Sequence, residues 1–471
     1  MLTYDLAQKE GYSIYEYLYR CIKRDILDGV LRADEKLPSK REFAKHHHIS
    51  LKTVENTYEQ LLTEGYIYAE EKRGYFVMPM GEENGKRVLG YESHFPFSVY
   101  QGNVPEEHYF ADFTSNQAAI DKFPFDTWAK TMRSVLTDKD TLLLESVPFQ
   151  GVFELRQAIA KYLYGFRGMQ VSPDQIIIGA GTEYLYGRLI QLLGKDHIYA
   201  VEDPGYQKIP KLYQVHNVDW EYVNVDENGM QIDKLHESNA NVVHVSPGHH
   251  FPTGSIMPIA RRKALLDWAE ADRERYIIED DYDSEFRFSR KPVPAIQSIN
   301  YNHRVIYMNT FSKTLAPSIR ISYMVLPRKL MERYVNTMNF YSCTVSAFEQ
   351  YTMAEFMNKG YFERHIHRMK KYYKERRDAL LKVLNESPLR EYVTIDEKDA
   401  GNHFLMKVKT TLSDTQLKWY AREHGIKLDC LSEYCVKDKE MFAHTIIVNY
   451  SDLEEENFRK ALEILLEVIC T

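Results

Sequence analysis

One stretch of the chain decides its fold: Thr310-Phe311-Ser312-Lys313-Thr314-Leu315-Ala316-Pro317-Ser318-Ile319-Arg320. It follows an apolar run, Val305–Met308, which predicts a buried strand. The stretch presents hydroxyls, one lysine and one arginine from a tight turn. A lysine in a polar pocket can form a Schiff base with an aldehyde cofactor, and hydroxyls with an arginine suit a phosphate. Taken alone, the same pattern also fits a surface turn.

Short apolar runs alternate with helical stretches on both sides of this segment. The runs rich in β-branched residues are Ile176–Ile178, Ile198–Val201, Val242–Val245, Tyr276–Ile278, Val305–Met308 and Ile321–Val325. This alternation predicts an α/β fold with a mostly parallel central sheet covered by helices. Helical patterns around weaker strands after residue 355 predict a smaller C-terminal α+β subdomain. Polar residues follow the ends of the runs, which is where ligands bind in open α/β sheets.

Three more strand ends carry chemistry that suits one cofactor. Ile277-Ile278-Glu279-Asp280-Asp281-Tyr282 supplies carboxylates and a phenol. A pyridoxal 5'-phosphate (PLP) site needs a carboxylate at the ring nitrogen and a hydroxyl donor at the ring oxygen. Gly179-Ala180-Gly181-Thr182 leads into an expected helix, whose free N–H groups suit a phosphate. Glu202-Asp203-Pro204-Gly205-Tyr206 adds an aromatic ring that can stack on a planar cofactor.

With these motifs in this order, residues 110–471 resemble the fold-type I, class I aminotransferases, whose F-P-T-G motif is also present at Phe251–Gly254. The resemblance implies that Lys313 carries PLP. It also implies that Asp280, in preference to Asp281, pairs with the ring nitrogen and that Tyr282 meets the ring oxygen. Tyr206 would stack on the ring, and the phosphate would be held by Gly181, Thr182, Ser312 and Arg320.

The N-terminal segment has a different pattern. An apolar stripe over residues 13–28 predicts one helix, and Ser39 and Ser50 are expected to cap two more, Lys40–His46 and Leu51–Glu64. Tyr66–Ala69 and Tyr75–Met78 read as a small hairpin. Helix, helix, turn, helix and hairpin predict a winged helix-turn-helix over residues 1–78. Glycines, prolines and charges over residues 79–110 predict a linker to a body formed by residues 111–471.

This segment resembles the GntR family of DNA-binding regulators through Lys36–Ala44, Ile49–Val54 and Leu61–Ile67. The resemblance implies that DNA is contacted by Ser39, Lys40, Arg41, Lys52, Thr53, Asn56, Arg73 and Gly74. The net charge of the chain is −8, so DNA binding requires a local basic cluster, which lies between Lys36 and Lys52. The alternative is a winged helix that binds another protein.

A GntR-type head on an aminotransferase-like body is typical of the MocR subfamily, which Arg73–Val77, Ile277–Phe286 and Thr310–Pro317 also resemble. The resemblance implies a homodimer that recognises repeated DNA half-sites, with a head-to-tail arrangement as one option for the dimer. It also implies a PLP-dependent regulator that responds to a small molecule. A working aminotransferase with a regulatory head and a regulator for which PLP itself is the signal are the alternatives.

The sequence differs from these relatives at two places that bear on the cofactor and the effector. Aminotransferases have an asparagine where this chain has Phe251, and GABA-sensing members of the subfamily hold a carboxylate with two arginines. At the first arginine position stands Lys208, and the zone of the second, Leu428–Cys435, contains Glu433 and no arginine. An acidic residue there suits an amine, so a sensor of an amine or amino-acid-type molecule other than GABA is expected. His249, beside Phe251, is a further candidate for effector contact.

The remaining sequence features concern the location of the protein in the cell, its cysteines and one basic helical stretch. No apolar run is long enough for a membrane helix and no signal peptide is evident, so we expect a cytoplasmic protein. The five cysteines are scattered and form no metal-binding pattern. A basic, histidine-containing helical stretch near His365 and His367 is expected to lie on the surface.

Overall fold

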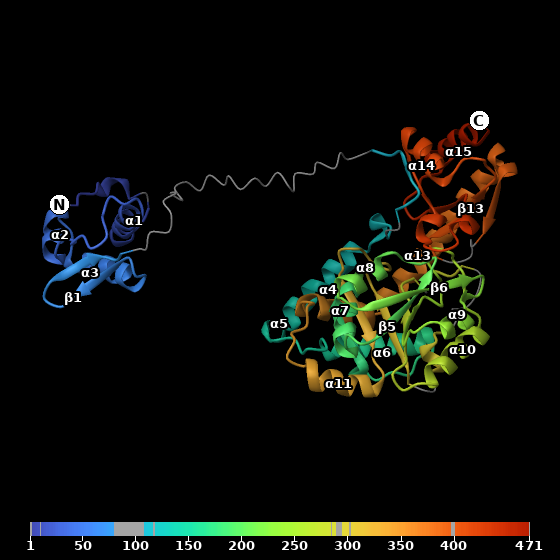
Figure 1. The fold of residues 1–471 in the computed structure, drawn as a ribbon, viewed down its shortest axis with the longest axis horizontal. Coiled ribbons are helices and arrows are strands. Elements are labelled where there is room, and N and C mark those ends of the chain that lie inside the picture. The colour runs from blue at the N-terminus through green and yellow to red at the C-terminus, as the bar shows by residue number, and fades with distance from the viewer. Residues whose placement is uncertain are drawn as a thin grey trace. The chain divides into compact units, whose positions relative to one another are not determined.

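The computed structural model describes residues 2–9, 11–79, 108–115, 118–283, 285–288, 294–300, 303–396 and 401–470. The chain divides into two compact units, Met1–Glu106 and Glu107–Thr471. Most of the expected linker, residues 80–107, lies outside the described residues (Figure 1).

The N-terminal unit has the expected winged helix-turn-helix order. Its elements are η1 (Leu6–Gln8), α1 (Ile14–Leu27), α2 (Lys40–His47), α3 (Leu51–Thr63), β1 (Ile67–Glu70) and β2 (Gly74–Val77). The strands pair antiparallel as the wing. Leu18, Ile22, Val54, Tyr58 and Leu61 form the centre of the core, because their helical spacing puts them on the inner faces of α1 and α3.

Serine caps set the starts of the second and third helices. The Ser39 hydroxyl accepts from the Glu42 N–H at 3.3 Å, and the Glu42 carboxylate accepts from the Ser39 N–H at 3.1 Å, which makes a capping box. The Ser50 hydroxyl accepts from the Thr53 N–H at 3.1 Å. These local bonds explain why both helix starts are readable from sequence.

The second unit is built on an eight-stranded sheet of order β4-β11-β10-β9-β8-β5-β6-β7. The strands are β4 (Ile176–Ala180), β5 (Ile198–Asp203), β6 (Asp219–Asp226), β7 (Gly229–Met230), β8 (Val242–Val245), β9 (Tyr276–Asp280), β10 (Val305–Thr310) and β11 (Ile321–Val325). The neighbours from β10 to β6 pair parallel, whereas β11 and β7 are antiparallel to their neighbours. The predicted mostly parallel sheet is confirmed, and several strands run further than predicted, into the polar residues at their ends.

Helices pack on both faces of this sheet. They are α4 (Phe125–Asp138), α5 (Asp140–Leu144), α6 (Phe153–Arg167), α7 (Thr182–Leu193), α8 (Lys208–Val215), α9 (Ile232–Glu237), α10 (Ile259–Glu270), α11 (Arg328–Met338) and α12 (Ala347–Asn358). One apolar core joins α4, α6 and α12 to the sheet, and another joins α7, α8 and α11 to it. In Figure 1, α9 and α10 lie near β6, and their apolar residues form a third core with the strands.

The C-terminal subdomain has a four-stranded antiparallel sheet of order β12-β13-β16-β15. Its elements are α13 (Tyr361–Glu386), β12 (Val393–Asp396), β13 (His403–Val408), α14 (Asp414–Glu423), β14 (Ile426–Lys427), β15 (Asp429–Cys430), β16 (Thr445–Asn449) and α15 (Glu455–Cys470). β14 pairs in parallel with β3 (Ala111–Asp112), so the beginning of the body is tied to this subdomain.

The expectation that His365 lies on the surface is wrong. Its side chain on α13 is 1% exposed, and its Nε2 lies 2.8 Å from the carbonyl oxygen of Thr314. Burial lowers the pKa of His365 to about 4. The long helix crosses the turn that contains Lys313, and the basic residues around His365 in sequence do not show which face of the helix is buried.

Candidate functional site

A cavity of about 260 Å³ lies at the carboxyl ends of the central strands. It is lined by Thr182, Tyr206, Asp280, Ser312, Lys313 and Arg320, all of which the sequence assigns to a cofactor, and by Lys208. These residues come from four separate segments of the chain. They meet here because parallel strands present their carboxyl ends at one edge of the sheet.

Lys313 lies in the turn that follows β10. The buried side chains of Phe311 and Leu315 anchor this turn in the core, and the Ser312 hydroxyl donates to the carbonyl oxygen of Ile319 at 2.7 Å. Burial lowers the pKa of Lys313, although the negative charges of nearby Asp283 and Asp280 act in the opposite direction. A lowered pKa increases the neutral amine fraction, which is the nucleophilic form.

Asp280 and Asp281 have different surroundings. One Asp281 oxygen lies 2.7 Å from an Arg167 nitrogen and accepts from the Tyr307 hydroxyl at 2.6 Å, away from the cavity lining. Asp280 accepts from the Tyr186 hydroxyl at 2.9 Å through one oxygen. Its other oxygen is buried and has no hydrogen-bond partner within the described residues. Asp280 therefore has an acceptor available in the cavity.

A cup suited to a phosphate forms where β4 meets α7. Gly181 has φ +96°, and a Cβ built there would lie 2.2 Å from an Arg320 guanidinium nitrogen. Only a glycine lets the chain turn here with Arg320 so close. The first N–H groups of α7 are free of helical partners, and Arg320 adds positive charge.

Glu183 was missed as a site residue by sequence reasoning. One of its oxygens lies 2.6 Å from Arg320, and the other is ion-paired with Lys208. The carboxylate thus joins the predicted phosphate arginine to the predicted effector lysine. No sequence signal marks this link, because Lys208 and Arg320 are far from Glu183 along the chain.

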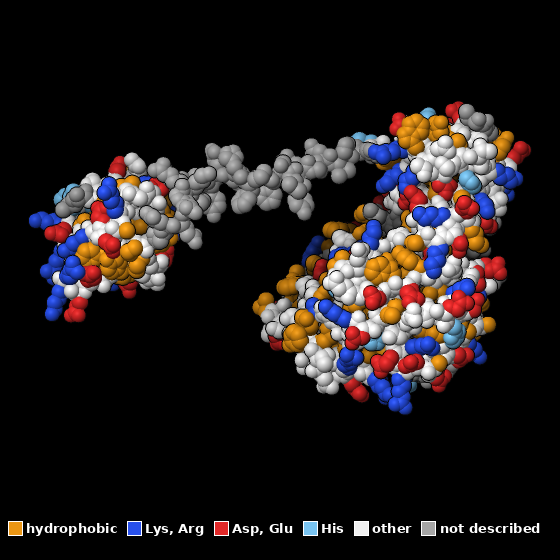
Figure 2. Space-filling model, viewed as in Figure 1, with side chains coloured by type: hydrophobic (Ala, Val, Ile, Leu, Met, Phe, Trp, Pro, Cys, Tyr) orange, Lys and Arg blue, Asp and Glu red, His pale blue; other side chains and the backbone are white. Residues whose placement is uncertain are grey.

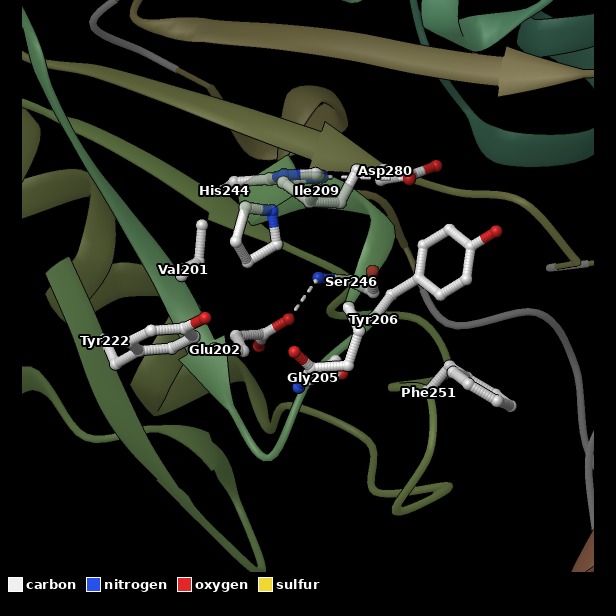
Figure 3. A pocket seen from close by; sticks show the side chains of 12 residues that line it. Val201, Glu202, Gly205, Tyr206, Ile209, Tyr222, His244, Ser246, Phe251 and Asp280 are labelled. Atoms are coloured by element: carbon white, nitrogen blue, oxygen red, sulfur yellow. Dashed lines mark hydrogen bonds and ion pairs between the residues drawn. The ribbon is translucent and has the colours of Figure 1, made fainter. Parts of the chain in front are cut away.

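A second, smaller pocket lies beside the first, around Glu202 (Figure 3). The Glu202 carboxylate accepts from the Ser246 N–H at 3.1 Å, drawn as a dashed line, and lies 3.4 Å from Nε2 of His250. Tyr206 and Phe251 lie at one side of the view, with ring centroids 6.0 Å apart. Burial raises the pKa of Glu202 to about 8.

The raised pKa of Glu202 leads to a pH-dependent stability. The folded chain keeps a proton on Glu202 that the unfolded chain loses above its usual pKa of 4.5. Stability should therefore fall as the pH rises from about 4.5 through about 8. Glu202→Gln cannot ionise, so it should be more stable than the natural chain at pH ~9 by about 2–4 kcal/mol, and much less so at pH ~5. Urea unfolding at both values measures this, and an equal difference at both would contradict it.

Phe251 occupies the position where aminotransferases have asparagine. Its ring contacts those of Tyr206, His403 and Tyr434, with centroid distances of 6.0, 5.6 and 5.3 Å. His403 lies on β13 and Tyr434 on η7 (Leu431–Tyr434), so Phe251 connects the large part of the body to its C-terminal subdomain. An apolar ring here offers no hydrogen bond to a cofactor oxygen.

The predicted DNA-contacting residues all belong to the N-terminal unit. Ser39, Arg41, Lys52 and Arg73 are exposed, whereas Lys40, Thr53, Asn56 and Gly74 are half-buried. Figure 2 shows Lys and Arg side chains gathered along one edge of this unit, near α2 and β1. In the wing, Arg73 is ion-paired with Glu70, and the Lys40 ammonium lies 4.9 Å from the centroid of the Tyr75 ring.

Comparisons with known proteins agree with this two-part structure. The family model "Aminotransferase class I and II" matches residues 110–465, and "Bacterial regulatory proteins, gntR family" matches residues 14–77. The HTH-type transcriptional regulator YdeL of Bacillus subtilis is 38% identical over 88% of both chains. The probable rhizopine catabolism regulatory protein MocR of Rhizobium meliloti is 29% identical, over 96% of this chain and 93% of its own. The chain belongs to the MocR-type regulators.

A solved structure supports the fold of the body of this MocR-type regulator. The kynurenine aminotransferase of Pyrococcus horikoshii, solved with PMP, is 25% identical with a TM-score of 0.67, over 78% of this chain and 91% of its own. The molecule is therefore a DNA-binding transcription regulator with an aminotransferase-like domain. Within the described residues, no helix is both long and apolar enough to cross a bilayer.

Of the three predicted effector residues in this MocR-type regulator, Lys208 lines the main cavity and Glu433 lines neither it nor the pocket around Glu202. The Glu433 carboxylate accepts from the Lys418 ammonium at 2.8 Å and from the Cys430 N–H at 3.1 Å. Glu433 thus stabilises the start of η7. His249, the third, is buried beside Tyr282, with its Nδ1 3.4 Å from the Tyr282 hydroxyl.

The stretch around Glu433 has another connection to the cavity. The Tyr434 carbonyl oxygen accepts from the Gly205 N–H at 3.1 Å and from the Gln207 side chain at 2.7 Å. The Asp203 carboxylate accepts from the N–H groups of Val436 and Lys437 at 2.8 and 2.9 Å. We call these four bonds the Asp203–Tyr434 latch. They attach the C-terminal subdomain to the segment that carries Tyr206 and Lys208.

Proposed function

We propose that this regulator holds PLP on Lys313 and senses, at that site, a small amine or amino-acid-type effector or PLP itself. The observation that carries the proposal is the combination of a buried lysine and a carboxylate with a free oxygen in one cavity. When bound, PLP supplies an electrophilic aldehyde carbon and an electron-withdrawing ring. The chain supplies the nucleophile, Lys313, and the groups that orient the ring.

The residues present fit this cofactor. The unpaired oxygen of Asp280 suits a protonated ring nitrogen. Arg320 lies against the turn at Gly181 and lines the cavity together with Thr182 at the start of α7, which suits a phosphate. Tyr206, half exposed, offers a ring face for stacking. In the proposal the cofactor is held by Lys313, Asp280, Tyr282, Tyr206, Gly181, Thr182, Ser312 and Arg320.

Two features favour a sensor over a working aminotransferase. Phe251 offers no polar group to a cofactor, and the ammonium of Lys208 is ion-paired with Glu183. A substrate carboxylate would have to displace Glu183 from Lys208, and lysine lacks the bidentate fork of arginine. Incubation of the PLP-loaded chain with amino acids and 2-oxoglutarate tests this. Steady turnover would favour the enzyme.

The Asp203–Tyr434 latch supports a route from the cavity to the rest of the molecule. An effector that contacts Tyr206 or Lys208 acts on the segment that the latch joins to the C-terminal subdomain. The effector shifts the balance between two body conformations only if it binds them with different affinity. We further propose a homodimer whose two heads read repeated half-sites. Footprinting of the DNA upstream of the regulated gene, with and without PLP, tests whether PLP changes the contacts of the two heads with the half-sites.

For the head, we expect Arg41→Ala to weaken DNA binding across all sequences and to lower the slope of log affinity against log salt by about 1. The exposed Arg41 at the start of α2 is proposed to contact a backbone phosphate, and phosphate contacts carry no base preference. Gel-shift titrations at two salt concentrations measure both effects. Arg459→Ala, an exposed arginine on α15, is the control of equal charge change. An unchanged Arg41→Ala affinity would refute the assigned DNA face.

A further inference from the structure

A chain of three polar side chains lies next to the proposed cofactor site. Nδ1 of His249 lies 2.7 Å from a carboxylate oxygen of Asp283 and 3.4 Å from the hydroxyl oxygen of Tyr282. His249 is 4% exposed and Asp283 is 7% exposed. Asp283 also lies close enough to Lys313 to act on its charge. The residue expected at the cofactor ring oxygen is thus in contact with a buried carboxylate–imidazole pair.

The imidazole ring of His249 has no room to turn. A Cβ built on Gly401, which has φ +71°, would lie 2.1 Å from Cε1 of His249 and 3.0 Å from the Asp283 carboxylate. The Gly401 carbonyl oxygen accepts from the buried Tyr450 hydroxyl at 2.8 Å, which holds the backbone in place. The His403 ring also packs against His249, with the two ring centroids 5.1 Å apart. The C-terminal subdomain therefore clamps this histidine against Asp283.

The carboxylate determines which ring nitrogen carries the proton. An ionised carboxylate only accepts hydrogen bonds, so Nδ1 of His249 must be protonated to face Asp283 at 2.7 Å. The same N–H faces the Tyr282 oxygen, which then acts as an acceptor on that side. The proton of the Tyr282 hydroxyl must consequently point away from His249.

We propose that Asp283 and His249 are positioning residues that direct the Tyr282 hydroxyl proton toward the ring oxygen of the cofactor. The pair would compensate for the asparagine that Phe251 has replaced in the same loop. A carboxylate behind a histidine is a common way to fix its tautomer. The inference rests on the proposed PLP site and concerns residues to which the cofactor motifs assign no role.

Two of the ionisable groups around His249 stay neutral in a test near neutral pH. Burial lowers the pKa of His250 and of His403 to about 3, so both are neutral above pH ~5. Lys313 and Asp280 belong to the cofactor site itself. Glu202, whose pKa burial raises to about 8, acts on Tyr282 through its charge. A midpoint that is the same in a Glu202→Gln chain therefore reports on the cofactor and on its hydrogen bonds.

The test is a pH titration of the visible absorbance of the full-length, PLP-loaded chain. A hydroxyl that donates to the ring oxygen stabilises the anionic form, so losing this donation should raise the titration midpoint. We expect His249→Gln, whose amide nitrogen replaces Nε2, to raise it by about one pH unit. His249→Asn, whose amide nitrogen replaces Nδ1, should keep it near the natural value. Tyr282→Phe and the double variant Tyr282→Phe/His249→Gln should share one midpoint, because His249 acts only through Tyr282.

His250→Gln is the matched control, since it removes a buried histidine of the same loop and should leave the midpoint in place. His249→Phe replaces the glutamine variant if that one does not fold, with the same expected rise. An unshifted midpoint in His249→Gln or His249→Phe, or a shift that adds to that of Tyr282→Phe, would overturn the inference while leaving PLP binding intact. A natural chain that takes up no PLP would overturn the proposed function and the inference together.

Discussion

Lys313→Ala should abolish the absorbance band near about 420 nm that the natural chain acquires with PLP. Lys313 is the buried lysine of the cavity, in the turn after β10, and alanine has no amine to form the covalent bond. Lys208, which also lines the cavity, is ion-paired with Glu183. Absorbance spectra of both proteins after PLP addition and removal of excess measure the effect. Borohydride reduction followed by mass spectrometry should leave the cofactor mass on the natural chain alone.

Lys382→Ala is the control for the Lys313 experiment. Its side chain is 77% exposed on α13, so it should keep the band at full height. Two outcomes would count against the proposal. One is a natural chain that shows no band at any PLP concentration, and the other is a Lys313→Ala chain that retains it.

Arg167→Met should lower the free energy of unfolding by about 3–5 kcal/mol, because it leaves Asp281 buried without its cation. The side chains of Arg167 and Asp281 are 2% and 3% exposed, and their nitrogen and oxygen atoms are 2.7 Å apart. Burial raises the pKa of nearby Glu279 and of Glu285 to about 7, and the positive charge of Arg167 acts against both rises. Urea unfolding followed by circular dichroism gives the difference.

The pair Arg156–Asp174 provides the comparison for Arg167→Met. The carboxylate of Asp174 is 80% exposed and 3.4 Å from Arg156, so Asp174→Asn should cost less than about 1 kcal/mol. If Arg167→Met lowered the free energy of unfolding as little as Asp174→Asn, the Arg167–Asp281 pair would not be what stabilises the buried Asp281 carboxylate. Arg167→Met should also weaken PLP binding, since Asp281 directly follows Asp280 at the end of β9.

The strands and helices were predictable because their signals are local. Ser39 and Ser50 cap helices through bonds to residues three positions away, and the β-branched runs formed the strands expected of them. The strand ends were less accurate. β5 continues to Asp203 and β10 to Thr310, because pairing with neighbouring strands carries the backbone past the apolar run.

The sequence predicted several residues that line the cavity, but it did not predict which side chains these residues contact. Sequence motifs placed Lys313, Asp280 and Arg320 at one sheet edge, and the cavity brings them together. The partnership of Asp281 with Arg167 on α6 depends on how that helix packs, more than a hundred residues earlier in the chain. Glu433, which the sequence assigns to an effector, has its carboxylate paired with Lys418 on α14, and its contact with an effector stays a prediction.

The sequence by itself determined a winged helix-turn-helix head, a mostly parallel α/β body and the lysine motif after β10, since periodicity, capping and strand-end residues act over a few positions. The tertiary structure alone decided that Asp281 pairs with Arg167 and that Glu183 pairs with Lys208. It also placed His249 between Asp283 and Tyr282 under Gly401. These contacts join residues distant in the chain, and packing, not local pattern, sets their distances.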